Sequence, residues 1–136
     1  MGYLIDAGAQ GLVAGTIDWD SDTIRARLSR TSETVARTAS SMTGVGLSAT
    51  DTAVSGRGGP TLDGTDHRNE YTCSNIAFAS VAAGAEIDKL VLFKFVTNDA
   101  DSIPIAVVSI TAQTPGSTVT ITADMSAGAF YLDLEP

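Results

Sequence analysis

The clearest alternation of apolar and polar residues runs from Thr23 to Arg30 and predicts an antiparallel β-strand. Its alternate positions form an apolar set, Ile24, Ala26 and Leu28, and a polar set, Thr23, Arg25, Arg27 and Ser29. We therefore expect this strand to be half-buried, with its arginines on the solvent side.

The second half of the chain reads as strand after strand. Residues 87–96 are apolar on both faces, which is typical of a central strand. Shorter strands are predicted over 70–78, 103–111, 118–122 and 129–134, with turns at Gly84, 98–102 and 113–117 between them. The pattern predicts an all-β fold: a single domain over residues 1–136, either an antiparallel β-sandwich or a jelly-roll-like barrel.

Two segments carry weaker signals. Gly8, Gly11 and Gly15 disfavour a long helix, so residues 1–14 are expected to form an extended N-terminal arm with short strands at 3–5 and 11–13. Residues 31–59 are rich in Ser, Thr, Ala and Gly and are interpreted as a variable, exposed insertion, where a binding function is expected. Within it, residues 33–39 are compatible with one or two helical turns, and 54–60 are expected to be a loop.

Composition and charge argue against two functional classes, nucleic-acid-binding proteins and proteins with a membrane-spanning helix. The net charge of −8 argues against nucleic-acid binding, because phosphates require a basic surface. No stretch of about 18 apolar residues is present, so no membrane span is expected, and the N-terminus lacks the pattern of a secretory signal. We expect a soluble protein that is made and used, or assembled, inside a cell. Six of the eight basic residues are arginines in the first 68 positions, an asymmetry that suits head-to-tail contact between copies.

The acidic cluster Asp18, Asp20 and Asp22 suggests a calcium-binding loop, but two later residues argue against one. These residues match the first three ligand positions of such a loop. Thr23, however, stands where the loop needs Gly, and Ser29 stands where it needs a bidentate Glu. The cluster is better interpreted as a polar turn that precedes the strand.

No catalytic pattern is found. His67 and Cys73 are the only residues of their types, which excludes the common zinc sites. A G-x-S-x-G elbow is absent, and Gly56–Gly59 lacks both the phosphate-loop and the dinucleotide pattern. We therefore expect no enzyme activity, no cofactor and no metal, with His67 in an exposed loop or at a strand end and Cys73 as a small core or edge residue.

Trp19, the only tryptophan, has two interpretations. Its indole can close one end of the core, with the N–H donating to a carbonyl or to water. Alternatively, it lies in a contact between subunits. The first is favoured for a lone, large aromatic residue inside a turn-strand motif.

The segment from Gly15 to Leu28, GTIDWDSDTIRARL, resembles the G-x-I-D-W-x-x-D-T-I-K-V-x-L opening of a family of small virion proteins of tailed bacteriophages. Further short segments resemble later strands of that family: Thr61–Gly64, Asn75–Phe78, Leu90–Lys94, Ser102–Ala106 and Val119–Thr122. The likeness extends to roughly Leu134, but residues 31–59 are divergent, and Ala123 stands where the family has a second Trp.

The resemblance implies a β-sandwich component of the virion. Proteins of this kind and size include capsid decoration, or cement, proteins, which bind the outer surface of the phage head as oligomers, often trimers. It implies the major capsid protein as the partner, a homo-oligomer, with a trimer favoured, and assembly in the host bacterial cytoplasm. The alternative is a tail, head–tail connector or fibre-knob protein.

The same resemblance suggests which residues contact a partner. A Gly-rich arm is the natural part to reach a neighbouring subunit and add a strand to its sheet. The candidate partner-binding residues are Tyr3, Leu4, Ile5, Leu12, Val13 and Trp19.

Overall fold

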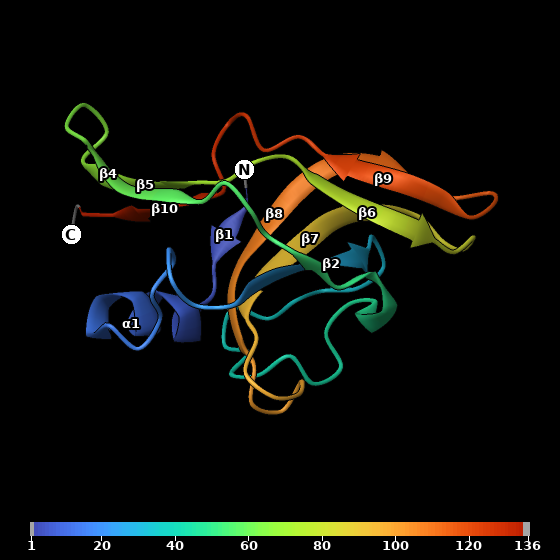
Figure 1. Cartoon of the computed structure of the whole chain (residues 1–136), viewed down its shortest axis with the longest axis horizontal. Coiled ribbons are helices and arrows are strands. Elements are labelled where there is room, and N and C mark those ends of the chain that lie inside the picture. The colour runs from blue at the N-terminus through green and yellow to red at the C-terminus, as the bar shows by residue number, and fades with distance from the viewer. Residues whose placement is uncertain (1, 135–136) are drawn as a thin grey trace.

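The computed structural model describes residues 2–134 and confirms the all-β, antiparallel fold. The helix and strands, in chain order, are β1 (Tyr3–Leu4), α1 (Asp6–Ala14), β2 (Ile24–Arg30), the 3-10 turn η1 (Ser48–Thr50), β3 (Thr52–Ala53), β4 (Gly58–Asp63), β5 (Arg68–Thr72), β6 (Ile76–Val81), β7 (Ile87–Lys94), β8 (Ile103–Gln113), β9 (Val119–Ala123) and β10 (Phe130–Asp133). Figure 1 shows them as two layers of strands with α1 at one end.

The larger layer is a five-stranded sheet of order β1-β8-β7-β2-β3. β7 lies between β8 and β2, and Leu90 is aligned with Leu28 on one side and with Val108 on the other. The prediction of a central strand over 87–96 is therefore confirmed. All pairs in this sheet are antiparallel.

The opposing layer consists of a three-stranded sheet, β10-β5-β4, and a two-stranded sheet, β6-β9. The main core lies between the two layers and includes Ile24, Leu28, Leu92, Phe78 and Ile121. Apolar residues of β2 on the predicted face thus point into this core. β4, β5 and β10 extend to one side as an arm above α1 (Figure 1).

The second face of the five-stranded sheet is also covered, which corrects two expectations. A smaller core joins Val91 and Phe93 to Val35 and Met42 of the irregular segment 31–47. Arg27, expected to face solvent, is only 1 % exposed beneath this segment. Segment 31–59 is therefore not simply an exposed insertion, because part of it forms the outer cover of the sheet.

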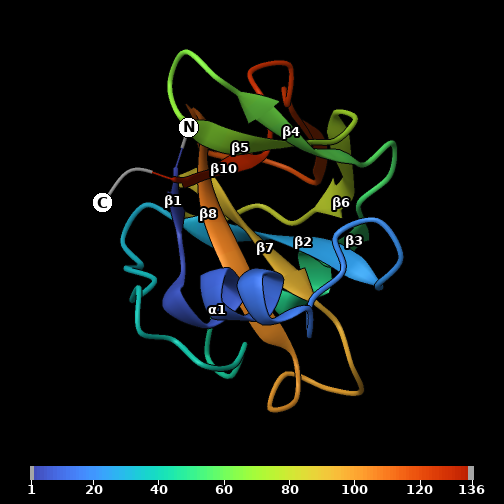
Figure 2. The ribbon, with the colours of Figure 1, turned by 90° about the vertical axis from the view of Figure 1, so that its left-hand side faces the viewer.

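The N-terminal segment is not an extended arm. β1 pairs with β8 of the same chain, and residues 6–14 form a helix where a strand at 11–13 had been expected. Gly8 explains why this helix forms so close to the sheet: a Cβ at Gly8 would lie 2.4 Å from Cα of Ile105. Packing against β8 outweighs the weak helix propensity of the glycines. Figure 2 shows α1 crossing in front of β8.

Smaller differences concern strand ends. The strand predicted over 70–78 is divided into β5 and β6, and Cys73 lies in the break. Residues 33–39 form no helix, and Gly58–Pro60, expected to be loop, begin β4. The turns near Gly84, at 98–102 and at 113–117 lie close to where they were predicted. Within residues 2–134, no helix has the length and apolar character needed to cross a membrane.

Candidate functional site

The acidic cluster forms a closed polar turn. The Asp18 carboxylate accepts hydrogen bonds from the backbone N–H groups of Asp20 and Ser21, at 3.0 and 3.2 Å. Hydrogen bonds from the Ser21 side chain and backbone lower the pKa of Asp18. Asp22 accepts from the Asp18 N–H at 2.8 Å and pairs with Lys94 at 2.9 Å. In this turn the carboxylates of Asp18 and Asp22 are already bound by groups of the protein itself. No metal-binding cluster of His, Cys, Asp and Glu occurs within residues 2–134.

His67 and Cys73, the two other residues considered for catalysis or metal binding, do not lie in a functional site. His67 occupies the exposed turn between β4 and β5, as expected for a loop histidine. Cys73 is half-buried beside the main core, and its burial raises the pKa of the thiol to about 11. A thiol with that pKa stays protonated at neutral pH and is a poor nucleophile.

Trp19 closes one end of the core, in agreement with the favoured interpretation. It is 2 % exposed, and its Nε1 donates to the carbonyl of Thr72 at 3.2 Å. Its ring meets Phe130 and Tyr71 edge-on, with centroids 5.0 and 6.2 Å away, and these two rings stack at 4.6 Å. A subunit contact through the indole is not supported, because almost none of it reaches the surface.

Arg57 holds the turn around Trp19 in place. Its Nη1 donates to the backbone carbonyls of Trp19 and Asp22. These hydrogen bonds join the motif at 15–28 to the loop before β4 and form a corner of the fold.

Sequence reasoning missed the role of Arg27. Its guanidinium donates to Asp51 at 2.6 and 2.8 Å, to Asp99 at 2.8 and 3.1 Å, and to the carbonyl of Val45 at 2.9 Å. The side chain also lies over the ring of Phe93, 5.1 Å from its centroid. The hydrogen bond from Arg27 lowers the pKa of Asp99. Because every donor direction is occupied by this chain's own groups, the cluster is structural.

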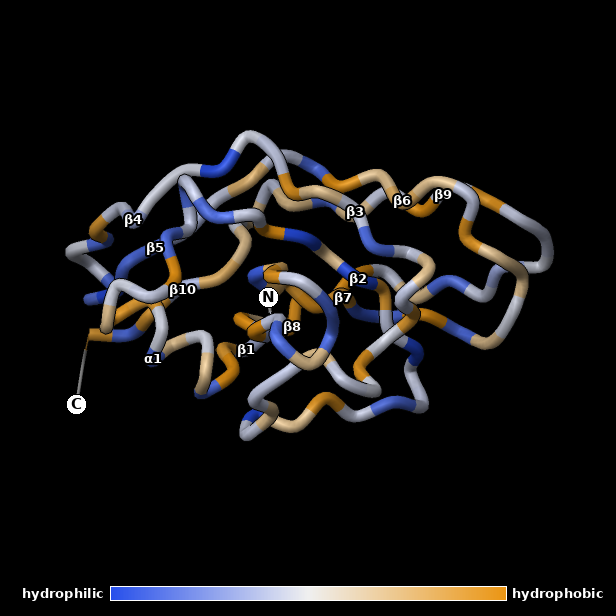
Figure 3. The backbone as a smooth tube through the Cα atoms, turned by 60° about the horizontal axis from the view of Figure 1, so that its bottom comes forward, coloured by the Kyte–Doolittle hydropathy of each residue, from blue (hydrophilic) through white to orange (hydrophobic). Residues whose placement is uncertain are grey.

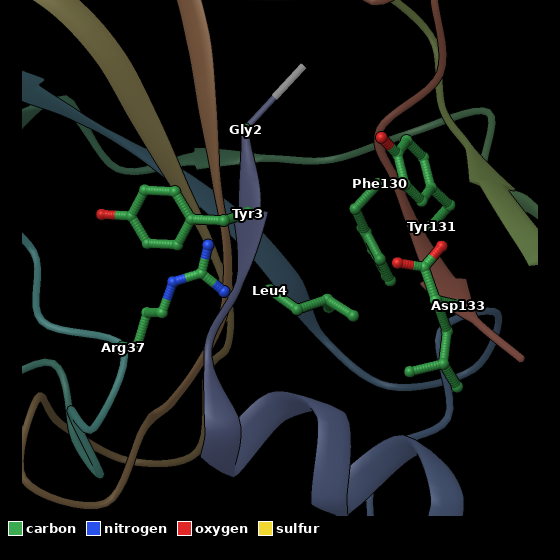
Figure 4. A pocket seen from close by; sticks show the side chains of 8 residues that line it. Gly2, Tyr3, Leu4, Arg37, Phe130, Tyr131 and Asp133 are labelled. Atoms are coloured by element: carbon green, nitrogen blue, oxygen red, sulfur yellow. The ribbon is translucent and has the colours of Figure 1, made fainter. Parts of the chain in front are cut away.

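The best candidate for binding is a cleft between β1 and β10, which we call the β1–β10 cleft (Figure 4). It encloses about 390 Å³. Its walls include Tyr3, Leu4, Arg37, Phe130, Leu132 and Asp133. The lining therefore combines aromatic and aliphatic side chains with the basic Arg37 and the acidic Asp133.

The six predicted partner-binding residues are distributed between the surface and the core. Tyr3 and Leu4 border the cleft, and in Figure 4 Leu4 points toward Phe130 while Tyr3 points toward Arg37. The Tyr3 hydroxyl donates to the carbonyl of Val35 at 2.7 Å. Ile5 is fully buried, which removes it from any partner surface in this conformation.

Two of the six candidate partner-binding residues, Leu12 and Val13, lie on α1. Leu12 is half-buried against the main core, whereas Val13 is 76 % exposed. Of the six residues, only Tyr3, Leu4, Leu12 and Val13 thus retain accessible surface, while Ile5 and Trp19 belong to the interior.

Two exposed leucines at the same end of the molecule were not predicted. Leu62 on β4 is 67 % exposed, and Leu134, directly after β10, is 51 % exposed. The sequence does contain a signal for Leu62, a large apolar residue directly before the polar turn that begins at Asp63. Its proximity to β10 depends on strand order, which the sequence pattern does not reveal.

No protein-family model, curated protein or solved structure matches this chain.

Proposed function

We propose that this protein is a structural component of a tailed-bacteriophage virion, and specifically a capsid decoration (cement) protein on the outer surface of the head. The observation that carries the proposal is the motif from Gly15 to Leu28, which resembles the opening of small virion proteins. In the fold, the turn of this motif forms the corner that Trp19 and Arg57 hold together, and its last residues form the first part of β2.

The physical role of such a protein is to add interface free energy. A protein that binds only the assembled shell shifts the equilibrium toward the assembled state by mass action. This role requires a rigid fold and a binding surface but no catalytic group. The two-layered core and the β1–β10 cleft are suited to that requirement.

We further propose that the major capsid protein is the partner and that the protein acts as a homo-oligomer, with a trimer favoured. A trimer matches the threefold positions where capsomers meet. The head surface is then the location in the virion, after assembly in the bacterial cytoplasm. Of the six candidate partner-binding residues, this proposal keeps the four with accessible surface in the contact surface: Tyr3, Leu4, Leu12 and Val13.

The proposal is tested by cryo-electron microscopy of the intact particle that carries the protein, with its copies counted. Hundreds of copies at threefold positions of the shell support the cement function. A few copies on the tail axis replace it with the alternative of a tail, connector or fibre-knob protein. Absence from the particle overturns both.

A further inference from the structure

A second cleft, smaller than the β1–β10 cleft, lies at the corner that Trp19 closes, and we call it the α1–β4 cleft. It encloses about 230 Å³. Its lining includes Leu12 of α1, Asp20 of the turn before β2, Pro60 of β4 and Tyr71 of β5. The cleft thus brings together apolar, acidic and hydroxyl side chains from segments that are distant in the sequence.

The Tyr71 side chain carries a hydroxyl that the protein itself does not use. Tyr71 is only 6 % exposed, and its ring packs against the rings of Phe130 and Trp19, with centroids 4.6 and 6.2 Å away. Within residues 2–134 the hydroxyl has no hydrogen-bond partner. Every fully buried side-chain N or O atom of these residues does have a partner, so this hydroxyl must keep some accessible surface, and Tyr71 lines the cleft. It can donate or accept a hydrogen bond from a ligand there.

The carboxylate of Asp20 is a second unused polar group beside the cleft. Asp20 is exposed, and within the described residues its carboxylate accepts no hydrogen bond and forms no ion pair; only its backbone N–H is bound, by Asp18. Burial and then the charge of Asp20 raise the pKa of Tyr71, so the carboxylate lies close enough to the phenol for the two to interact.

The charges around this turn are unbalanced. Asp18, Asp20 and Asp22 lie within five positions of each other, and Lys94 pairs with Asp22 at 2.9 Å. Arg57 is the other cation nearby, and its Nη1 donates to two backbone carbonyls of the turn. Three negative side chains therefore face two positive ones, and the carboxylate without an ion pair that lines the cleft is Asp20.

The end of α1 adds to the negative field. α1 ends at Ala14, and Gly15, with a φ of 78°, terminates the helix and lines the cleft. The C-terminal end of a helix carries partial negative charge on its free carbonyls, which favours a cation. No basic residue occupies the last turn of α1. Figure 3 also shows hydrophobic positions along this helix, and Leu12 supplies one apolar part of the lining.

A second copy of the chain has few cations to offer to this site. All but one of its eight Lys and Arg side chains contact carboxylates, carbonyls or aromatic rings of the same chain. The exception is Arg30, at the exposed end of β2. The net charge of −8 also repels a second copy and attracts a basic partner. A different protein is therefore the better source of a cation.

We propose that the α1–β4 cleft binds a basic side chain, Lys or Arg, of a different, partner protein. The aliphatic part of that side chain contacts Leu12 and Pro60, and its terminal cation lies between the Asp20 carboxylate and the Tyr71 hydroxyl. This inference goes beyond the proposed function, because it specifies the chemistry of a partner's side chain and applies equally to a partner on the head or on the tail.

The test uses the full chain labelled with ¹⁵N and n-butylammonium chloride, which reproduces the four-carbon stem and the ammonium of lysine. The matched neutral probe is n-butanol, with sodium chloride added to keep the ionic strength equal. We expect the cation to shift the amide signals of Asp20 and Tyr71 most, and n-butanol to bind about fivefold more weakly. Equal binding by n-butanol, shifts centred elsewhere, or no binding by the cation overturns the proposal.

Two variants test the two polar groups separately. Tyr71→Phe removes only a hydroxyl that has no partner in the fold, so the melting temperature should be retained. Tyr71→Phe and Asp20→Asn should each weaken binding of n-butylammonium about threefold to fivefold. The matched control is Asp101→Asn, because Asp101 is exposed in the turn after β7 and does not line the cleft. Unchanged binding by both cleft variants, with Trp19 emission showing that they are folded, contradicts the assignment.

Two further measurements examine the other possible occupants. Saturable shifts of the same amides by millimolar calcium chloride, lost in Asp20→Asn, overturn the proposal in favour of a metal ion. Self-association of the unliganded chain in sedimentation, lost in Asp20→Asn and retained in Asp101→Asn, overturns it in favour of a second copy. Absence of the protein from the phage particle, by contrast, removes the proposed function and leaves the n-butylammonium result unaffected. The two failures are therefore distinguishable.

Discussion

Arg27 and Asp99 form an ion pair of 2.8 Å although 72 residues separate them in the chain. The pair connects β2 to the turn between β7 and β8, and Asp51 binds the same guanidinium from the segment before β3. One buried side chain thus fastens three parts of the chain over the second face of the central sheet.

Removal of this guanidinium is expected to destabilise the fold strongly. Arg27→Met keeps much of the side-chain volume but leaves the carboxylates of Asp51 and Asp99 without a partner. Loss of one member of a buried ion pair costs about 3 kcal/mol in the free energy of unfolding. Urea denaturation measures this loss in the free energy of unfolding. Asp99→Asn should cost less, about 1 kcal/mol, because the Asp99 side chain is 41 % exposed; an equal loss in the two variants would contradict this assignment.

Stability should decline in acid. The pKa of Asp99 is lowered by the hydrogen bond from Arg27; the pKa of Asp22 is also lowered, because bonds from Asp18 and Lys94 outweigh its burial. A carboxylate with a lowered native pKa stabilises the fold above its unfolded pKa, near 3.8, and loses that contribution as pH falls through the native value. We expect a nearly constant melting temperature from pH 7 to 5 and a fall below pH 4.

A matched pair of variants isolates the part of this acid response that Asp99 contributes. Asp99→Asn should flatten the fall below pH 4, whereas Asp101→Asn, at an exposed position in the same turn, should preserve it. A profile of Asp99→Asn parallel to that of the unmodified protein is the opposing result.

Gly8→Ala is expected to destabilise the protein, against the usual trend. Replacement of Gly by Ala inside a helix normally stabilises it by about 1 kcal/mol. At Gly8 the new Cβ would lie 2.4 Å from Cα of Ile105, so α1 must move away from β8, at a cost of about 1–3 kcal/mol. Thermal unfolding measures the sign. Gly116→Ala, with no heavy atom within 4 Å of its Cβ, should change stability by less than about 0.5 kcal/mol.

Trp19 should report folding by its fluorescence and contribute substantially to stability. As the only tryptophan, buried at one end of the core, it should emit at short wavelength in the native state and shift to the red on unfolding. Trp19→Ala should cost about 3–5 kcal/mol because it leaves a cavity beside Phe130. Circular dichroism in urea measures this loss, with Tyr131→Phe as a near-neutral control.

Cys73 should react slowly with thiol reagents in the folded protein. Burial raises the pKa of its thiol to about 11, so the thiolate fraction at pH 8 is small. A colorimetric disulfide reagent should label it at least tenfold faster in 8 M urea than in buffer. Equal rates would show that the native thiol is accessible and ionised.

The local pattern of apolar residues was sufficient to predict a strand that is buried on both faces. Residues 87–96 are apolar on both faces, and β7 is covered on both faces, so periodicity alone identified the centre of the sheet. The role of Trp19 followed from its size and its place in a turn. Both predictions depend on local chemistry and only weakly on topology.

The sequence pattern failed to predict burial and secondary structure where segments distant in the chain pack against a residue. Arg27 occupies a polar position of an alternating strand, yet segment 31–51 covers it and supplies Asp51. The glycines before Gly15 disfavour a helix by propensity, but close approach to β8 requires one of them. Likewise, the β1–β10 cleft brings Tyr3 and Leu4 of β1 next to β10, a strand of another sheet near the C-terminus, and no local pattern reveals this contact.

The pairing of β1 with β8 also determines when the protein can fold during synthesis. Tyr3 and Leu4 pair with Val107 and Ala106, so the first strand has no partner until the chain beyond position 107 has left the ribosome. Contacts that join such remote segments slow folding, because a long loop must close before they form. Nascent chains that stop before β8 should therefore lack the partner of β1 and one of the two neighbours of β7, so the N-terminal segment should dock only after β8 has been released.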